Sequence, residues 1–168
     1  KTTNGLVSRH GLMPLSFTMD TVGALTRTVR DNACLTAIMA GQDPLDATTS
    51  SRPVPDYEAT LGQSIKGLRI GVPANYYYEV TTPEIKELQD ASIAVFRDLG
   101  AEIIEIEVPD MHVPTHMSNI VFPAEAATIH GTWLRERPED YQDQVRSRYE
   151  IGLYIPAAKY LSALGARV

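Results

Sequence analysis

Leu68-Arg69-Ile70-Gly71-Val72-Pro73 is a short, mainly apolar run that a proline ends, which is typical of a buried strand. Thr82 and Pro83 then have the residue types found at the start of a helix, and apolar residues recur behind them at helical spacing. Further on, Ile104-Glu105-Ile106-Glu107-Val108 alternates in the manner of a strand with one face in water. A strand, a helix and a second strand within about forty residues predict one βαβ unit (residues 68–108) with parallel strands.

The residues before this unit predict turns and one helix. Residues 5–20 mix apolar residues with glycine and proline, which favours short strands and turns. A helix is predicted to begin after Thr28, because Thr28 and Asp31 have the spacing of a capping box, and to end before Gly41, a residue type common just past helix ends. The second half of that helix is apolar on almost every side, so we expect it, with Cys34, to be buried.

The residues after this unit predict a helical region. Apolar residues from Met117 to Leu134 keep one helical face, and Pro123 should kink that helix or mark its start. Further helical stripes are predicted at Tyr141, Val145 and Tyr149, and at Ile155, Leu161, Leu164 and Val168. The fold class is therefore α/β, with one βαβ unit followed by helices.

Composition limits the partners of this chain. Its 168 residues are 43% hydrophobic and 21% charged, which is the balance of a globular domain. The net charge of -6 leaves no basic surface for nucleic acid or anionic lipid, so small or neutral partners are favoured. No apolar run approaches the roughly 20 residues that span a bilayer, and the single cysteine, Cys34, excludes an internal disulfide. We therefore expect a cytoplasmic protein that does not enter a membrane.

A search for catalytic and cofactor motifs finds no complete site. The sequence has no glycine-rich phosphate loop, no His-Glu-x-x-His and no Gly-x-Ser-x-Gly, so no cofactor is predicted. Asp110, His112 and His116 have a spacing that could serve a metal ion on a helix. Pro109 and Pro114 argue against a regular helix there. We predict no metal site and expect these histidines at the surface or at the rim of a pocket.

Glu125 is an unusual polar residue, because it lies within the otherwise small and apolar segment of residues 124–127. A carboxylate on such a helix face must be hydrogen-bonded, paired with a charge or in contact with a cavity. From the sequence, a structural pairing and a role in a pocket are both open.

Four segments near the start of the chain resemble, in order and spacing, the block that follows the catalytic core of the amidase-signature family. They are residues 1–11, 14–23, 25–31 and 40–46. The resemblance continues more loosely through residues 66–73, 99–101, 125–127 and 158–163. The family's usual Lys-Pro-Thr reads Lys1-Thr2-Thr3 here, its Gly-Pro-Leu reads Gly23-Ala24-Leu25 and its Asp-Ala-Ala reads Asp31-Asn32-Ala33, which indicates a divergent subfamily.

The resemblance implies a mixed β-sheet flanked by helices and a Ser-Ser-Lys triad in which one serine lies in a cis peptide. All three catalytic residues belong to segments before Lys1, so none can be assigned to a position of this sequence. The chain also begins without methionine and ends inside a helical pattern. We therefore expect residues 1–168 to be the central part of a single amidase-signature domain. They would need the missing N- and C-terminal parts of the same chain and would be inactive alone.

The resemblance leaves supporting roles for four residues near the N-terminus. Ser16 and Asp20 belong to a stretch that would run through the sheet close behind the nucleophile loop. Arg27 and Asp31, four residues apart at a helix start, are expected to form an ion pair that fixes the helix.

The resemblance also indicates candidates for substrate binding. The helix predicted over residues 117–134 corresponds to the region that covers the acyl pocket in relatives. Phe122, Glu125 and His130 lie in it and are our candidates for contact with the substrate.

Three functions fit these observations. We favour a stand-alone amidase that hydrolyses a small carboxamide to a carboxylic acid and ammonia or an amine through an acyl-enzyme, and a homodimer would be compatible with it. The second function is that of the glutaminase subunit of a glutamyl-tRNA(Gln) amidotransferase, which needs a partner and tRNA. Such relatives typically carry Asn-Leu-Ala-Arg after the Glu-Ala pair, whereas residues 128–132 read Thr-Ile-His-Gly-Thr. The third is a non-catalytic interaction module.

Overall fold

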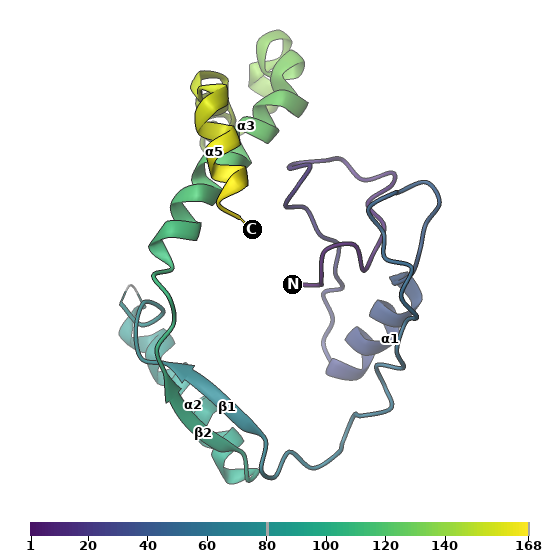
Figure 1. Cartoon of the computed structure of the whole chain (residues 1–168), viewed down its shortest axis with the longest axis vertical. Helices are drawn as coiled ribbons and strands as arrows, with labels where there is room; N and C mark the ends of the chain where they lie inside the picture. The colour runs from purple at the N-terminus through teal and green to yellow at the C-terminus, as the bar shows by residue number, and fades with distance from the viewer. Residues whose placement is uncertain (80, 168) are drawn as a thin grey trace. The chain divides into compact units, whose positions relative to one another are not determined.

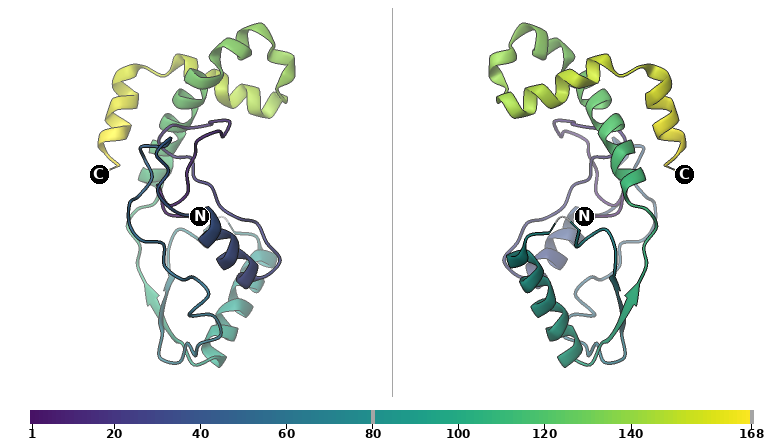
Figure 2. Two further views of the ribbon diagram at one scale, coloured as in Figure 1. Left: turned by 90° about the vertical axis from the view of Figure 1, so that its right-hand side faces the viewer. Right: turned by 90° about the vertical axis from the view of Figure 1, so that its left-hand side faces the viewer.

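The computed structural model describes residues 1–79 and 81–167, and the chain forms two compact units. Unit 1 comprises Lys1–Leu61 and His116–Val168, and unit 2 comprises Gly62–Thr115. Val168, which the sequence predicts in the last helix, lies outside the described residues. Figure 1 and Figure 2 show the course of the chain through the elements of both units.

Unit 2 contains the predicted βαβ unit. Strand β1 (Arg69–Pro73) is followed by helix α2 (Pro83–Asp98) and strand β2 (Glu102–Ile106), and the two strands pair in parallel. Figure 1 shows the two strands side by side. The side chain of Ile106 packs over Gly71, where a Cβ atom would lie 2.8 Å from the Ile106 Cδ1 atom. The α/β fold class is confirmed.

The sheet is smaller than predicted. The described residues contain two parallel strands and no mixed sheet, because residues 5–20 form turns where strands were expected. Val7 makes an isolated antiparallel bridge with Ala40. The Asp20 N–H donates to the Ser16 carbonyl at 3.2 Å and closes a turn. Among the described residues, side chains and not a neighbouring strand bind the backbone of residues 15–18. That residues 16–20 run close behind a nucleophile loop stays a prediction.

Helix α1 (Val29–Met39) begins as predicted. The Thr28 hydroxyl accepts a hydrogen bond from the Asp31 N–H at 3.1 Å, as the side chain of an N-cap residue does. Gly41 follows the helix with a φ of 136°, which favours glycine, and its N–H donates to the Leu6 carbonyl at 3.0 Å. The glycine therefore joins the helix end to the N-terminal segment.

The predicted burial of α1 is wrong for the described part of the chain. Ala33 and Thr36 are buried, but Cys34 is exposed and Ile38 is 73% exposed. Ala33 and Thr36 lie three residues apart on one face of α1, so the described residues cover the helix on that face. The remaining apolar surface of α1 is not covered by the described residues.

The C-terminal helices lie largely in unit 1. They are α3 (His112–Glu136), α4 (Asp143–Glu150) and α5 (Ala157–Gly165), with the short 3-10 helices η1 (Pro138–Asp140) and η2 (Ile151–Tyr154) between them. Pro114 falls in the first turn of α3, where its missing N–H removes no helical hydrogen bond. The prediction that Pro109 and Pro114 prevent a regular helix at His112 is therefore wrong. Pro123 lies inside α3 and does not mark its start. Among the described residues, no helix combines the length and the hydropathy needed to cross a bilayer.

The core of unit 1 lies along α3. Its buried apolar residues include Val121, Ala126, Ala127 and Leu134. The backbone of η2 approaches α3 at Gly152, where a Cβ atom would lie 1.9 Å from the Pro123 carbonyl oxygen and 2.7 Å from the Ala127 Cβ atom. Close contact between the two backbones therefore requires glycine at this position.

Gly152→Ala should destabilise the chain, because the added methyl group collides with the α3 backbone and overpacking costs about 1–3 kcal/mol or more. Chemical denaturation measures this free energy of unfolding. Gly165→Ala is the matched control, since nothing lies within 4 Å of a Cβ atom there and alanine is favoured over glycine in a helix by about 1 kcal/mol. Equal stability of the Gly152→Ala variant and the wild type would show that the close contact is not made.

Candidate functional site

The buried carboxylate of Glu125, on α3, is the centre of the candidate site. The residue is 2% exposed, and its two oxygens accept four hydrogen bonds. The donors are the Ser16 hydroxyl, the Thr18 N–H at 3.0 Å, the Thr18 hydroxyl at 2.8 Å and the Tyr160 hydroxyl at 2.8 Å. We call Glu125, Ser16, Thr18 and Tyr160 the Glu125 clamp. Of the two roles left open by the sequence, the structure shows hydrogen-bonded pairing, which offsets the cost of burying the charge.

The clamp joins three segments of unit 1. Ser16 and Thr18 lie on a turn, Glu125 lies on α3 and Tyr160 lies on α5. Ser16 is buried, and its oxygen also accepts the Met19 N–H at 3.2 Å. The Ser16 hydroxyl therefore binds α3 and the backbone of its own turn at once, and its role as a support stays a prediction.

Protonation states in the clamp fit these hydrogen bonds. Burial raises the pKa of the Glu125 carboxyl, but the hydrogen bonds that it accepts, first that from Ser16, outweigh burial and hold this pKa below its ordinary value. Burial and the hydrogen bond to Glu125 raise the pKa of the Tyr160 hydroxyl. At neutral pH the carboxylate is therefore an ionised acceptor and the tyrosine a protonated donor.

Arg167, just after α5, binds the clamp at Thr18. Its guanidinium donates to the Thr18 hydroxyl oxygen at 2.6 Å and to the Thr18 carbonyl at 3.2 Å. The Thr18 hydroxyl in turn donates its own proton to Glu125. A continuous chain of hydrogen bonds thus runs from the end of α5 through the turn to α3.

His130, another predicted substrate contact on α3, is also buried. Its Nε2 atom lies 3.2 Å from the Pro14 carbonyl oxygen, which can only accept, so Nε2 carries a hydrogen. Its Nδ1 atom lies 2.9 Å from the Tyr141 hydroxyl. The imidazole therefore links α3 both to the N-terminal segment and to the residues before α4.

Phe122, the third predicted substrate contact, shares an aromatic cluster with His130 and takes no part in the Glu125 clamp. Its ring meets that of Tyr149 edge to face, with centroids 6.0 Å apart, and the Tyr149 ring lies 4.9 Å from that of His130. The Tyr141 ring lies 5.8 Å from the imidazole. The structure thus brings two of the three predicted residues together and places the third in a separate network.

The predicted ion pair between Arg27 and Asp31 is absent from the ion pairs of the described residues. Helix α1 begins at Val29, and its N-cap Thr28 has an extended backbone. Arg27 therefore precedes the helix and does not stand one helical turn from Asp31, which is the geometry that an i, i+4 pair needs.

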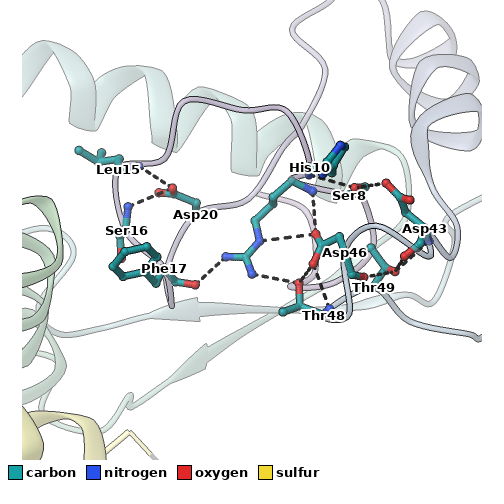
Figure 3. A network of polar contacts seen from close by, with 11 residues as sticks. Ser8, His10, Leu15, Ser16, Phe17, Asp20, Asp43, Asp46, Thr48 and Thr49 are labelled. Carbon is teal, nitrogen blue, oxygen red and sulfur yellow. Dashed lines mark hydrogen bonds and ion pairs between the residues drawn. The ribbon is translucent and has the colours of Figure 1, made fainter. Parts of the chain in front are cut away.

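A second polar network, which the sequence did not predict, joins residues 8–9 to residues 43–49 (Figure 3). The Asp46 carboxylate accepts the Thr48 hydroxyl at 2.6 Å, the Arg9 N–H at 2.8 Å and the Thr48 N–H at 3.0 Å. These hydrogen bonds, that of the Thr48 hydroxyl first, lower the pKa of Asp46 to about 2. The carboxylate is therefore ionised at any physiological pH.

The Arg9 side chain extends this network to the turn that the Glu125 clamp holds. Its Nη1 atom donates to the Phe17 carbonyl at 2.7 Å and its Nη2 atom to the Thr48 hydroxyl oxygen at 2.9 Å. Arg9 and Asp46 both lie in segments that carry the family resemblance, which is the one signal for them in the sequence. Nothing in the spacing pairs two residues 37 positions apart.

Asp20, predicted as a support, closes the same turn (Figure 3). Its Oδ2 atom accepts the Leu15 N–H at 2.8 Å and the Ser16 N–H at 3.0 Å. The backbone of the turn is thus bound by Arg9, which precedes it in the sequence, and by Asp20, which lies at its end.

The part of the chain that the structure describes contains no group of three side chains placed to hold a metal ion. In unit 2, the Nε2 atom of His112 lies 3.7 Å from a Glu79 carboxylate oxygen. A cavity of about 630 Å³ in unit 1 is lined by the N-terminal segment and α1, and none of the three predicted substrate contacts lines it.

The sequence matches the family model described as Amidase over residues 1–166. It is 42% identical, over 98% of its length, to a protein named Amidase from Pseudomonas putida, of which it covers 35%. It is 39% identical, over 99% of its length, to a glutamyl-tRNA(Gln) amidotransferase subunit from Beijerinckia indica subsp. indica, of which it covers 38%. The chain therefore spans little more than a third of the length of these relatives.

The fold is also that of a solved structure. With a TM-score of 0.87 and 30% identity, 99% of the chain aligns with 36% of a chain from a structure described as an unexpected vestigial protein complex that reveals the evolutionary origins of an s-triazine catabolic enzyme. The two units of this chain thus have counterparts within one longer chain.

Replacement of Glu125 should separate its role as an acceptor from its charge. Glu125→Ala leaves four donors without their acceptor and should lower the free energy of unfolding by about 3 kcal/mol or more. Glu125→Gln should cost less, because its amide oxygen can still accept the Thr18 N–H and the Ser16 hydroxyl while the Thr18 and Tyr160 hydroxyls turn to accept from the amide nitrogen. Denaturation curves of both variants measure the two losses, and equal losses would contradict this order.

Acid should weaken the chain through Glu125. The pKa of this carboxyl is lower in the folded chain, so its stabilisation is fully present above the ordinary pKa of about 4.3 and is lost as the pH falls through the lowered folded value. The difference in unfolding free energy between the wild type and Glu125→Gln should therefore shrink as the pH falls from about 5 to below 4. A difference that stays constant or grows over this range would contradict the assignment.

Proposed function

Because this chain belongs to the amidase-signature family, we propose that it is the central part of an amidase, an enzyme that hydrolyses a carboxamide to a carboxylic acid and ammonia or an amine. The observation that supports the proposal most is the match of nearly the whole chain to the family model and to an amidase. Residues 1–168 would form the middle of one amidase-signature domain, because the chain covers only part of such a relative.

The chemistry that we propose uses a Ser-cisSer-Lys triad outside residues 1–168. The nucleophilic serine oxygen attacks the amide carbonyl carbon while its proton passes through the second serine toward the lysine. The carbon–nitrogen bond then breaks, the nitrogen leaves with that proton, and the acyl group remains on the serine as an ester. Water attacks the ester in the same way and releases the carboxylic acid and the serine. Backbone N–H groups stabilise the negative charge on the carbonyl oxygen in both steps.

The residues of this chain would position the site and not react in it. Glu125 already accepts four hydrogen bonds, which fills the acceptor capacity of a carboxylate, so we now propose it as a support and not as a substrate contact. Phe122, which is half-buried, and His130 remain proposals for substrate binding. Without a nucleophile the isolated chain would keep weak binding at best and would not turn over an amide.

A second candidate is a glutaminase that forms one subunit of a glutamyl-tRNA(Gln) amidotransferase, which the 39% identical relative supports. Residues 128–132 depart from the pattern expected of that glutaminase, and for that reason we place the stand-alone amidase first. Hydrolysis of a small carboxamide without tRNA or a partner protein would favour the first candidate. Glutamine hydrolysis that requires a partner would favour the second.

A non-catalytic interaction module is the least supported function. A self-contained module would bury most of its large apolar side chains, whereas Ile38 on α1 and Leu88 on α2 are both exposed. We further propose a cytoplasmic enzyme without a metal or cofactor. Its partners would be a small amide, the remaining parts of the same domain and a second copy in a homodimer.

A fluorophosphonate probe, which labels activated serines, tests the mechanism. The full-length protein that carries this chain should be labelled at one serine outside residues 1–168, and replacement of that serine by alanine should abolish both labelling and amide hydrolysis. The purified chain of 168 residues should show neither. Labelling or turnover by that chain would contradict the proposal that its residues only position the site.

A further inference from the structure

Asn4 and Gly5 form a tight turn near the start of unit 1. The Leu6 N–H donates to the Thr3 carbonyl at 3.1 Å, which closes a β-turn with Asn4 and Gly5 at its central positions. Gly5 has a φ of 78°, in the left-handed region that glycine adopts without strain. The turn therefore places a side-chain amide directly before the backbone N–H of a glycine.

Both of these groups are unbound within the described part of the chain. Among residues 1–79 and 81–167, no hydrogen bond holds the side-chain amide of Asn4 or the N–H of Gly5. Asn4 is exposed and Gly5 is partly exposed, so water reaches the turn. The fold thus leaves the amide and the neighbouring N–H free to react with each other.

The reaction open to such a pair is deamidation. The Gly5 nitrogen loses its proton to hydroxide and bonds to the Asn4 Cγ atom, and the bond from Cγ to the side-chain nitrogen breaks. That nitrogen takes up a proton and leaves as ammonia, so that a cyclic succinimide remains. Glycine favours the ring because it has no Cβ atom to hinder the approach of its nitrogen.

Water then opens the succinimide at either of its carbonyl groups. Cleavage between Cγ and the Gly5 nitrogen gives aspartate in place of Asn4. Cleavage between the backbone carbonyl carbon of residue 4 and the same nitrogen gives isoaspartate, whose main chain runs through the side chain and is longer by a methylene group. Both products carry a carboxylate that is ionised at neutral pH.

The other three asparagines of the chain lack this combination, and each precedes a residue with a side chain. The Asn32 amide nitrogen donates to the Ala24 carbonyl at 2.9 Å. The Asn75 side chain donates to the Val108 carbonyl at 3.0 Å and accepts the Val108 N–H at 3.1 Å. Asn119 lies inside α3, where the helix binds the backbone N–H groups. These residues are internal controls for Asn4.

We propose that Asn4 is a site of deamidation and that isoaspartate there separates the N-terminal turn from residues 48–50. The Gly5 carbonyl accepts the Ser50 N–H at 2.8 Å, and a Cβ atom on Gly5 would lie 2.5 Å from the Thr48 carbonyl oxygen. A longer main chain before Gly5 shifts it out of this close fit and breaks the hydrogen bond to Ser50. The reaction needs only water, so it does not depend on the proposed amidase function.

The test incubates the folded full-length protein that carries this chain at mildly alkaline pH, which favours loss of the Gly5 proton. Peptide mapping by mass spectrometry measures the conversion of each asparagine to aspartate or isoaspartate. Asn4 should lose its amide, while Asn32, Asn75 and Asn119 should keep theirs. A synthetic peptide of residues 1–11 gives the rate without the fold, and Asn4 in the folded protein should approach that rate. Asn4→Gln should stay unmodified, because the longer side chain disfavours the ring.

Amide exchange at Ser50 tests the structural consequence. The Ser50 N–H should lose protection in protein that carries isoaspartate and should keep it in Asn4→Asp, which has the charge without the longer main chain. An Asn4 amide that persists in the folded protein under conditions that convert the peptide would overturn the proposed site. Protection of Ser50 that survives the isoaspartate would overturn the separation of the turn from residues 48–50.

Discussion

The burial of one ionised carboxylate, that of Glu125, constrains the arrangement of unit 1. A carboxylate this far from water is stable only where donors surround it, and its donors lie far away in the sequence. Ser16 is 109 residues from Glu125 and Tyr160 is 35 residues from it. The turn, α3 and α5 must therefore come together in one way for the charge to be satisfied, which gives this part of the chain a specific packing that its small apolar residues alone would not select.

The other polar contacts of unit 1 act on the same turn. His130 binds the Pro14 carbonyl, Asp20 binds two N–H groups, and Arg9 carries the ionised Asp46 network to the Phe17 carbonyl. A segment without helix or strand has to find partners for its backbone groups elsewhere. In this chain charged or aromatic side chains bind most of these groups, and the Ser16 hydroxyl binds the Met19 N–H.

The sequence predicted the elements whose signals are local. The βαβ unit follows from apolar runs and from Pro83 at a helix start, and the N-cap Thr28 follows from hydroxyl chemistry three residues before Asp31. Predictions that depended on partners far away in the sequence were wrong or did not identify those partners. Residues 5–20 have the composition of short strands, but distant side chains bind their backbone, and the buried position of Glu125 could be suspected from its apolar neighbours while its partners could not. Burial of α1 was predicted from its apolar composition. Composition does not say which segment packs against the helix.

Amide hydrogen exchange at Thr18 tests the role of Glu125 most directly. If the carboxylate holds the turn, the Thr18 N–H should exchange slowly in the wild type and should lose its protection in Glu125→Ala, because the acceptor at 3.0 Å is removed. The Ala74 N–H, which donates to the Ile106 carbonyl at 2.9 Å in unit 2, reports whether folding elsewhere is preserved. Loss of protection at Thr18 with Ala74 still protected is the predicted result. Protection at Thr18 that survives removal of the carboxylate would contradict the central role of Glu125.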